Sequence, residues 1–244
     1  MQAVNLRNKL YLHRAKIILL GCVMAAGSLH AQSYKWARRN NPNYDERKLT
    51  YGFLIGLHTT AYQIEYSDSI VSPSLDSLHS IVPDWRPGFS LGFIVNYRLT
   101  EFLDLRLTPE VAFYEHRLRY NYTDGTFIDE NVETTMVEFP LLLKYKSMRR
   151  GNVRMYMIGG IKPGIEASGK KEIENTTTSL EVKTLTLNLE AGLGFDLYFP
   201  LFKFSPEIRF SRGISDVLDN TENPFGYPLR RVNTNTITVY LLFQ

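Results

Sequence analysis

The chain has 244 residues, with 28 lysines and arginines against 25 aspartates and glutamates, and a single cysteine. Four basic residues and no acidic ones lie in the first 31 residues, so the remaining chain carries 24 basic and 25 acidic side chains. This balance excludes a basic surface for nucleic acid, and one cysteine excludes a disulfide framework. No linker divides the chain, so we expect one folded domain.

Residues 1–31 have the pattern of an export signal. Four basic residues precede the apolar run 17–26, and small residues then lead to Gln32. The run is too short to span a membrane as a helix, but it matches the apolar region of a secretory signal. The sequence therefore predicts a signal peptide over 1–31. Cys22 leaves lipidation as the alternative, because 19–22 resemble a lipid-attachment box.

Residues 32–48 are polar and basic without apolar periodicity, which predicts a flexible periplasmic arm that is free to meet a partner. From 49 to 244, short stretches alternate apolar residues with small or polar ones, as strands with two different faces do. The clearest stretch is 185–199, where leucine, alanine and phenylalanine fill every odd position. We expect eight strands, over residues 49–66, 88–99, 103–116, 137–145, 153–166, 185–199, 202–210 and 236–243.

The connections between these strands alternate strictly in length. The long ones are 67–85, 123–131, 168–182 and 213–231, and the short ones lie near 100, over 147–152 and near 200. Outer-membrane barrels combine short periplasmic turns, long extracellular loops and an even strand count. We therefore predict an all-β fold, an eight-stranded antiparallel transmembrane β-barrel of OmpA or OmpX size. It would lie in the bacterial outer membrane with both termini in the periplasm.

Alternation alone leaves the orientation of the apolar face open. In a secreted, lipocalin-like barrel the same face would point inward around a small ligand. An eight-stranded barrel is only wide enough for side chains to fill, and eight faces rich in leucine and phenylalanine would overfill it. Glycines such as Gly192 and Gly194 gather on the other face, where crowding favours them. We therefore expect the apolar face to meet lipid.

The inward face would then carry equal numbers of acids and bases. They are Asp104, Glu110, Glu138, Glu190, Asp196 and Glu207 with Arg98, Arg106, Lys144, Arg154, Lys162 and Arg209. Buried charges cost several kcal/mol each unless they pair and form hydrogen bonds. We expect a structural charge network that fills the lumen, and a polar conduit or proton path is the alternative.

Four prolines, Pro109, Pro140, Pro163 and Pro206, fall inside the predicted strands. Proline cannot donate to a strand ladder, so it ordinarily argues against a central strand. We expect bulges, local gaps or a position near the rim to accommodate them.

Residues 88–92 match the G-x-S-x-G pattern around Ser90, which exposes a nucleophile only at a sharp strand-to-helix turn. Here the pattern lies inside an alternating strand. His58, His79 and His116 lack the spacing of zinc ligands. We expect no catalytic residue, metal, cofactor or small-molecule substrate. A lipid-modifying or proteolytic barrel that uses Ser90 and His116 is the enzymatic alternative.

Several strand motifs resemble the PorT family of small Bacteroidetes-type outer-membrane barrels. They are Glu138-Phe139-Pro140-Leu141-Leu142-Leu143-Lys144-Tyr145, residues 156–164, Ala191-Gly192-Leu193-Gly194-Phe195-Asp196 and Pro206-Glu207-Ile208-Arg209-Phe210-Ser211. The resemblance covers the chain from about residue 49 to its end. It implies a non-enzymatic barrel that serves the type IX (Por) secretion system, which exports proteases and adhesins.

The partners that the resemblance implies are other secretion-system or envelope proteins, together with outer-membrane lipid. The family brings no catalytic residues, so none is assigned. A structural or adhesive barrel of the OmpX kind, which acts through its extracellular loops, is the alternative.

Overall fold

The computed structural model describes residues 40–68, 77–167, 183–218 and 225–244. A 3-10 helix, η1 (Tyr44–Glu46), precedes eleven strands. They are β1 (Leu49–Tyr66), β2 (Leu78–Asp84), β3 (Arg86–Arg98), β4 (Leu103–Leu107), β5 (Glu110–Tyr122), β6 (Phe127–Glu138), β7 (Leu141–Lys146), β8 (Val153–Glu166), β9 (Leu185–Tyr198), β10 (Lys203–Gly213) and β11 (Leu229–Phe243). No helix in this part of the chain is long and apolar enough to cross a membrane. The predicted signal peptide and the predicted loop 168–182 lie outside the described residues.

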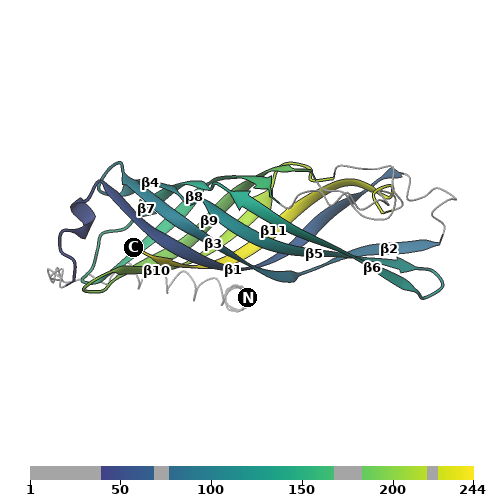
Figure 1. The fold of residues 1–244 in the computed structure, drawn as a ribbon, viewed down its shortest axis with the longest axis horizontal. Helices are drawn as coiled ribbons and strands as arrows, with labels where there is room; N and C mark the ends of the chain where they lie inside the picture. Colours follow the sequence, from purple (N-terminus) through teal and green to yellow (C-terminus); the bar gives the residue numbers. More distant parts are fainter. Residues whose placement is uncertain (1–39, 69–76, 168–182, 219–224) are drawn as a thin grey trace, which may run out of the picture. The chain divides into compact units, whose positions relative to one another are not determined.

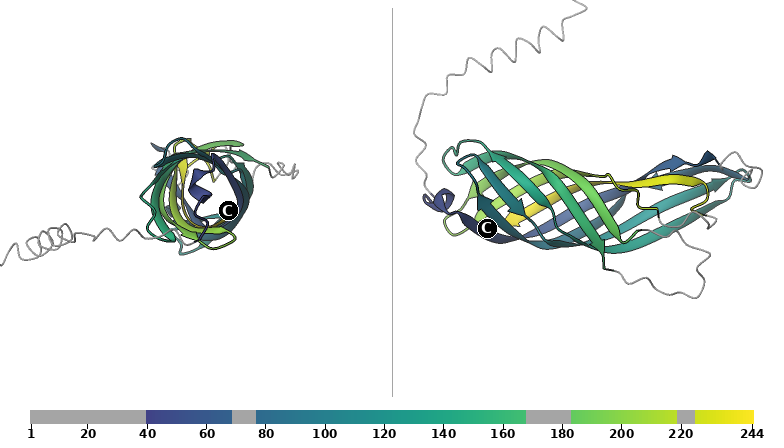
Figure 2. Two further views of the ribbon diagram at one scale, coloured as in Figure 1. Left: turned by 90° about the vertical axis from the view of Figure 1, so that its left-hand side faces the viewer. Right: turned by 90° about the horizontal axis from the view of Figure 1, so that it is seen from above.

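The strands form one antiparallel sheet that closes on itself (Figures 1 and 2). β1 pairs with β3 on one side and with β11, the last strand of the chain, on the other. β9 pairs with β10 and also with β8, so the ladder continues around the wall. Closure satisfies backbone groups that a membrane interior would otherwise leave unpaired. We call the end with the β3–β4, β7–β8 and β9–β10 connections the turn end, and the opposite end the loop end.

The structure has eleven strands where the sequence predicted eight. β4 and β5 together replace one predicted strand, and β6 and β7 replace another. The two gaps contain Pro109 and Pro140, which have no N–H to donate. Their carbonyl oxygens still accept backbone hydrogen bonds, and β3 and β8 run past the gaps to pair on both sides. The other two prolines, Pro163 and Pro206, lie within β8 and β10.

Strands also extend further towards the loop end than predicted. β2 and the beginnings of β6 and β11 replace parts of the predicted loops 67–85, 123–131 and 213–231. The apolar pattern is reversed in this region, because Leu118 and Tyr120 of β5 are buried while the intervening Arg119 is partly exposed. These segments were not predicted as strands, because the prediction required apolar residues on the outer face.

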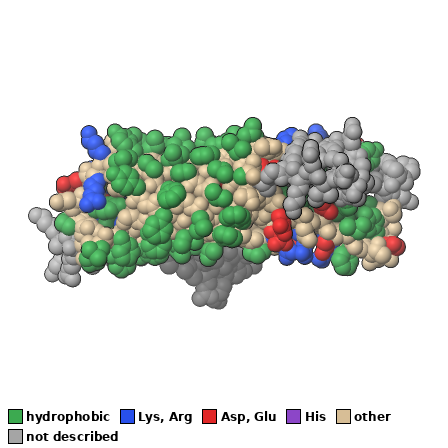
Figure 3. All heavy atoms as spheres, viewed as in Figure 1, with side chains coloured by type: hydrophobic (Ala, Val, Ile, Leu, Met, Phe, Trp, Pro, Cys, Tyr) green, Lys and Arg blue, Asp and Glu red, His purple; other side chains and the backbone are tan. Residues whose placement is uncertain are grey.

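Apolar side chains cover the outside of the wall (Figure 3). Tyr51 of β1 and Phe93 of β3 are 68% and 70% exposed, whereas inward neighbours such as Leu54 and Ile94 are buried. Acidic and basic side chains gather beyond the apolar surface, towards the end where Figure 1 shows β2, β5 and β6. The apolar face thus points outward, which rules out the lipocalin-like arrangement with that face around a ligand.

Two neighbouring glycines of β8 test the close packing of the wall. A Cβ on Gly160 would lie 2.1 Å from the Leu141 carbonyl oxygen of β7, whereas a Cβ on Gly159 would have its nearest neighbour at 3.6 Å. We expect Gly160→Ala to cost about 1–3 kcal/mol of folding free energy, the usual range for overpacking. Gly159→Ala should stay near the wild-type value. Urea unfolding of the barrel in lipid vesicles measures both, and equal losses would contradict the assignment.

Candidate functional site in the barrel interior

The structure buries eleven of the twelve charged residues that we expected on the inward face, and we call these eleven the central network. They are Asp104, Arg106, Glu110, Glu138, Lys144, Arg154, Lys162, Glu190, Asp196, Glu207 and Arg209. Arg98, the twelfth inward charge expected, is only half-buried near the turn end. Because strand side chains alternate between two faces, the period that puts leucines outside puts these charges inside.

Glu207 of β10 joins two buried arginines. Arg106 of β4 donates from Nη1 to Glu207 Oε2 at 2.9 Å, and Arg209 donates from Nε to the other carboxylate oxygen. The Tyr156 hydroxyl of β8 also donates to Glu207. Arg209 reaches a second carboxylate, with Nη1 3.4 Å from Glu190 Oε2 of β9. Residues from four strands therefore share one ionic cluster with no exposed side-chain surface on Arg106, Glu207, Arg209 or Glu190.

A second cluster of the central network lies around Asp196 of β9. Lys144 Nζ of β7 is 2.7 Å from Asp196 Oδ2, and the Ser205 hydroxyl donates to Oδ1 at 2.7 Å. Lys144 also lies 3.6 Å from the centre of the Tyr156 ring, a cation–π contact. Lys203 of β10 is farther from Asp196, at 3.9 Å. Asp196 thus receives positive charge from two strands.

Glu138 and Glu110 receive donors towards the loop end. Lys162 Nζ is 3.0 Å from Glu138 Oε2, and the Tyr114 hydroxyl donates to the same oxygen at 3.0 Å. The Tyr240 hydroxyl donates to Glu110 Oε1 at 2.9 Å, and Ser90 donates to Oε2 at 3.2 Å.

The serine of the G-x-S-x-G pattern has no nucleophile geometry. Ser90 lies in the middle of β3, is 1% exposed and donates to Glu110. The hydroxyl of Thr60, not that of Ser90, lies 3.2 Å from His116 Nε2. A strand interior does not supply the sharp turn that the pattern needs. Among the described residues, no three of histidine, cysteine, aspartate and glutamate are grouped to hold a metal ion.

Residues 40–47, part of the arm expected from the sequence, contact the barrel wall, and we call them the turn-end plug. The side chain of Asn40 donates to the Tyr198 carbonyl oxygen and that of Asn41 to the Phe199 carbonyl oxygen, each at 2.8 Å. Both acceptors lie where β9 ends. The arm has no apolar period because polar side chains attach it to the wall. Residues 32–39 lie outside the described residues.

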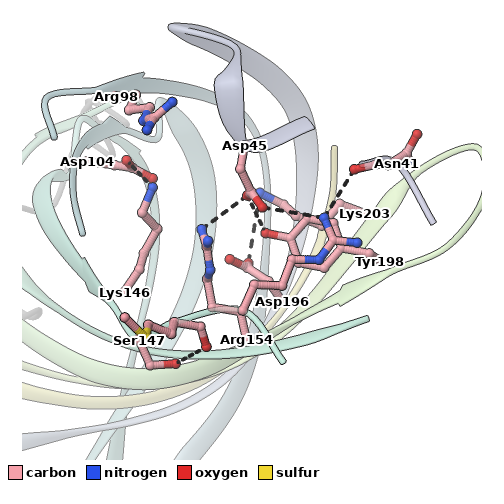
Figure 4. Close-up of polar contacts among 12 residues, drawn as sticks. Asn41, Asp45, Arg98, Asp104, Lys146, Ser147, Arg154, Asp196, Tyr198 and Lys203 are labelled. Carbon is pink, nitrogen blue, oxygen red and sulfur yellow. Dashed lines mark hydrogen bonds and ion pairs between the residues drawn. The ribbon is translucent and has the colours of Figure 1, made fainter. Parts of the chain in front are cut away.

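Asp45 of η1 carries the charge of the plug into the barrel (Figure 4). Its Oδ1 lies 3.1 Å from Arg154 Nη1 and accepts from the Tyr198 hydroxyl at 2.7 Å, while Oδ2 lies 3.4 Å from Arg149 Nη1. Burial by itself raises the pKa of Asp45, but the Tyr198 hydroxyl and the two guanidiniums outweigh it and hold that pKa below its ordinary value. The carboxylate is therefore charged at neutral pH.

Sequence reasoning missed this part of the interior. Lys146 pairs with Asp104 at 2.5 Å, and Lys203 lies over the Tyr44 ring at 4.7 Å. The two-residue alternation of strand faces was the available signal. Lys146 lies on the same face of its strand as Lys144, and Lys203 lies on the same face as Glu207. The contact of Asp45 with Arg149 and Arg154 joins residues more than 100 positions apart and has no signal in the local pattern.

The plug gives a prediction with a matched control. A carboxylate with a lowered pKa stabilises the fold fully above its unfolded pKa of about 3.9, and its contribution is lost as the pH falls through the folded pKa. Asp45→Asn removes the charge at neutral pH. It should therefore cause the same loss of stability that low pH causes in the wild type. We expect about 1–3 kcal/mol less protection of the Glu46 and Arg47 amides, both hydrogen-bonded in η1, in hydrogen exchange. Glu46→Gln, which changes an exposed carboxylate of η1, should leave the Arg47 amide unchanged; equal loss there would contradict the role of Asp45.

The loop end of the interior is closed by apolar side chains, which we call the loop-end cluster. Its buried members are Tyr62, Ile81, Leu118, Tyr120, Val217, Leu218, Leu229 and Val232. Between this cluster and the plug, the described interior contains a cavity of about 40 Å³ beside His116 and one of about 20 Å³ beside Asp45. A cavity needs about 10–15 Å³ of such volume to hold one water molecule, so each has room for only one to a few waters. Side chains therefore occupy most of the lumen that the structure describes.

A comparison with models of protein families agrees with this architecture. A family model described as an outer membrane protein β-barrel domain matches residues 30–219. A search of curated proteins finds no match. Among solved structures, OprG from Pseudomonas aeruginosa is 14% identical and covers 79% of this chain and 93% of its own, with a TM-score of 0.43. Neisserial surface protein A is 12% identical and covers 80% of this chain and 98% of its own, with a TM-score of 0.41. The outer membrane enzyme PagL is 11% identical and covers 78% of this chain and 97% of its own, with a TM-score of 0.35.

Proposed function

The chain belongs to the outer membrane β-barrel domain family, and from that premise we propose that it is a non-enzymatic barrel that supports type IX (Por) secretion of proteases and adhesins. In this role it acts through contacts with other envelope proteins and conducts nothing. The observation that supports the non-conducting part is the packed interior, in which Arg106 of β4 pairs with Glu207 of β10 across the lumen, with the plug at one end and the loop-end cluster at the other. The secretion part rests on the resemblance of the strand motifs to the PorT family.

We further infer that the eleven strands make eight traverses of the outer membrane. The pairs β2–β3, β4–β5 and β6–β7 are separated by one or two residues each, so each pair continues one traverse. With the short turns on the periplasmic side, the plug and the C-terminus also lie there. Gln244 supports a common end, because it exchanges backbone hydrogen bonds with Lys203, the first residue after the β9–β10 turn.

The conduction part is tested by reconstituting the protein in a planar lipid bilayer. We expect no steady ion current from the wild-type barrel. A double variant, Asp45→Ala with Lys144→Ala, enlarges the turn-end half of the lumen and serves as the comparison. A current through the wild-type protein that scales with salt concentration would refute a closed lumen.

The secretion part needs a deletion strain in which export of a type IX protease is measured. We expect export to fall when the gene is deleted and to recover with the wild-type gene. A second variant changes only exposed residues of the turn end, such as Glu46 and Lys48, and must still be folded and non-conducting. If the turn end contacts the partner proteins, this variant should fail to restore export. Unchanged export in the deletion strain would dismiss the secretion role.

A different feature favours a structural or adhesive barrel that acts through its loop end. β5 and β6 run as a hairpin beyond the apolar wall, and Arg119 and Asp129 form an ion pair on it at 2.7 Å. If binding to a host or matrix protein is lost when the hairpin tip 122–126 is shortened, while protease export stays normal, this function replaces the secretion role. Ser90→Ala and His116→Ala address the enzymatic alternative, and unaltered lipid A and protease profiles would close it.

A further inference from the structure

A groove of about 300 Å³ lies on the outer wall where the apolar surface ends, and we call it the rim groove. It is lined by Gln63, Glu65, Leu189, Arg212, Gly213, Ile214, Arg231 and Asn233. These residues come from the neighbouring strands β1, β9, β10 and β11 and from the residue that follows β10. The groove is therefore part of the closed wall and separate from the charge network inside it.

Two arginines give the groove its character. The side chain of Arg212 is exposed and forms no hydrogen bond or ion pair within the part of the chain that the structure describes. Arg231 is held in place, with Nη2 donating to the Ile214 carbonyl oxygen at 2.8 Å and Nε donating to Asn233 at 3.2 Å. One fixed guanidinium and one without a protein partner thus line the same groove.

Other arginines near the loop-end edge of the wall differ in this respect. Arg86 lies 2.8 Å from Glu115, and Arg119 lies 2.7 Å from Asp129. Each of these guanidiniums is already neutralised by a carboxylate. Arg212 differs from these two arginines, because its guanidinium has no carboxylate partner among the described residues.

The surroundings of the groove are amphipathic. Leu189 is 54% exposed in its lining, and Phe210, the outward residue of β10 before Arg212, is 47% exposed. The first outward apolar residue of β11 beyond Asn233 and Asn235 is Ile237. A ligand here would set acyl chains against the wall and a charged head group against the arginines.

We propose that the rim groove binds the phosphorylated head group of an outer-leaflet glycolipid of the lipid A type. Guanidinium groups bind phosphate through paired, charge-assisted hydrogen bonds, and Arg212 and Arg231 supply two such groups. The groove opens where acyl chains meet head groups, which favours a lipid over a soluble anion or an acidic peptide. The proposal rests on the orientation given under the proposed function, since it places the loop end in the outer leaflet.

The test uses the full-length protein purified in detergent and native mass spectrometry of its complexes. The probes are bisphosphorylated lipid A, dephosphorylated lipid A and phosphatidylglycerol. We expect the wild type to retain bisphosphorylated lipid A at least about tenfold more tightly than the other two, as charge-assisted hydrogen bonds of this kind predict. Equal retention of dephosphorylated lipid A, or of phosphatidylglycerol, would overturn the proposal.

Matched variants separate this groove from general surface charge. Arg212→Gln with Arg231→Gln should lose most of the preference for the phosphorylated lipid. Arg86→Gln with Arg117→Gln removes the same amount of charge from another part of the loop-end edge. This double variant should keep the preference for the phosphorylated lipid. Glu65→Gln removes the only carboxylate in the described lining and should strengthen binding. Equal losses in the two double variants would overturn the proposal.

Two further measurements keep the outcomes distinct. Heat-modifiable migration on gels shows whether each variant is a folded barrel, and only folded variants are compared. Labelling of a cysteine placed at residue 125 on intact cells reports which end is outside. Labelling absent from intact cells but present in lysed ones would overturn both the orientation and the glycolipid site, whereas correct labelling with no lipid preference would overturn the site alone.

Discussion

Glu207→Ala is expected to destabilise the folded barrel by about 3–5 kcal/mol, the usual cost of leaving a buried ion pair without one partner. Glu207 accepts from Arg106 and Arg209, and all three side chains are completely buried. Without the carboxylate, two guanidiniums stay buried in the lumen and lose the acceptor that they share. The free energy of unfolding, from urea titration of the barrel in lipid vesicles, measures the loss.

Glu133→Ala is the control for this change, because Glu133 is exposed on β6 and loses a carboxylate of the same size. It should change stability by less than about 0.5 kcal/mol, as surface substitutions usually do. A second comparison removes one arginine partner together with the Glu207 carboxylate. Arg106→Met with Glu207→Leu should be more stable than Glu207→Leu alone, since apolar pairs often replace buried ion pairs without loss. If Glu207→Ala and Glu133→Ala behave alike, the network does not hold the barrel together.

Phe93→Arg should cost about 2–4 kcal/mol, which is the penalty for an arginine facing lipid near the bilayer midplane. Phe93 is 70% exposed and pairs with Phe53, and this position lies midway along the apolar part of β3. A guanidinium there has no partner in hydrocarbon and must distort the bilayer or extend towards its surface. Refolding yield and urea stability in vesicles should both fall, while the same variant in a mild detergent should fold more readily.

Phe127→Arg is the matched control, because Phe127 is 61% exposed but lies near the tip of the β5–β6 hairpin. It changes the same residue type at similar exposure outside the apolar wall, and we expect little effect on refolding. Comparable penalties at the two positions would mean that the wall does not face lipid. A barrel that stays folded in buffer without detergent would lead to the same conclusion.

The lumen and the wall depend on each other in this protein. The outward leucines and phenylalanines place every second side chain inside, so a lipid-facing strand must put something else in a narrow interior. Ion pairs across the lumen, such as Arg106 of β4 with Glu207 of β10, occupy that space and tie strands that are distant in the sequence. The same pairs occupy much of the described lumen, which is why we propose that the function lies with the surfaces.

The sequence by itself determined the β class, the position of most of the wall strands and the face on which each wall residue lies. The two-residue period does this because it is local, and a strand cannot turn Leu193 outward without turning Asp196 inward. The eleven buried charges were predictable for the same reason. The family match then confirmed that the chain is an outer membrane barrel.

Tertiary structure alone decided the closures of the lumen, the rim groove and which of the four prolines interrupt a strand. The plug depends on Asp45 meeting Arg154, and the loop-end cluster depends on a region where the apolar pattern turns inward. Such contacts join residues far apart in the chain, so no local period records them. Which charge meets which partner is set by how the strands are staggered around the cylinder, and that stagger exists only once the sheet has closed.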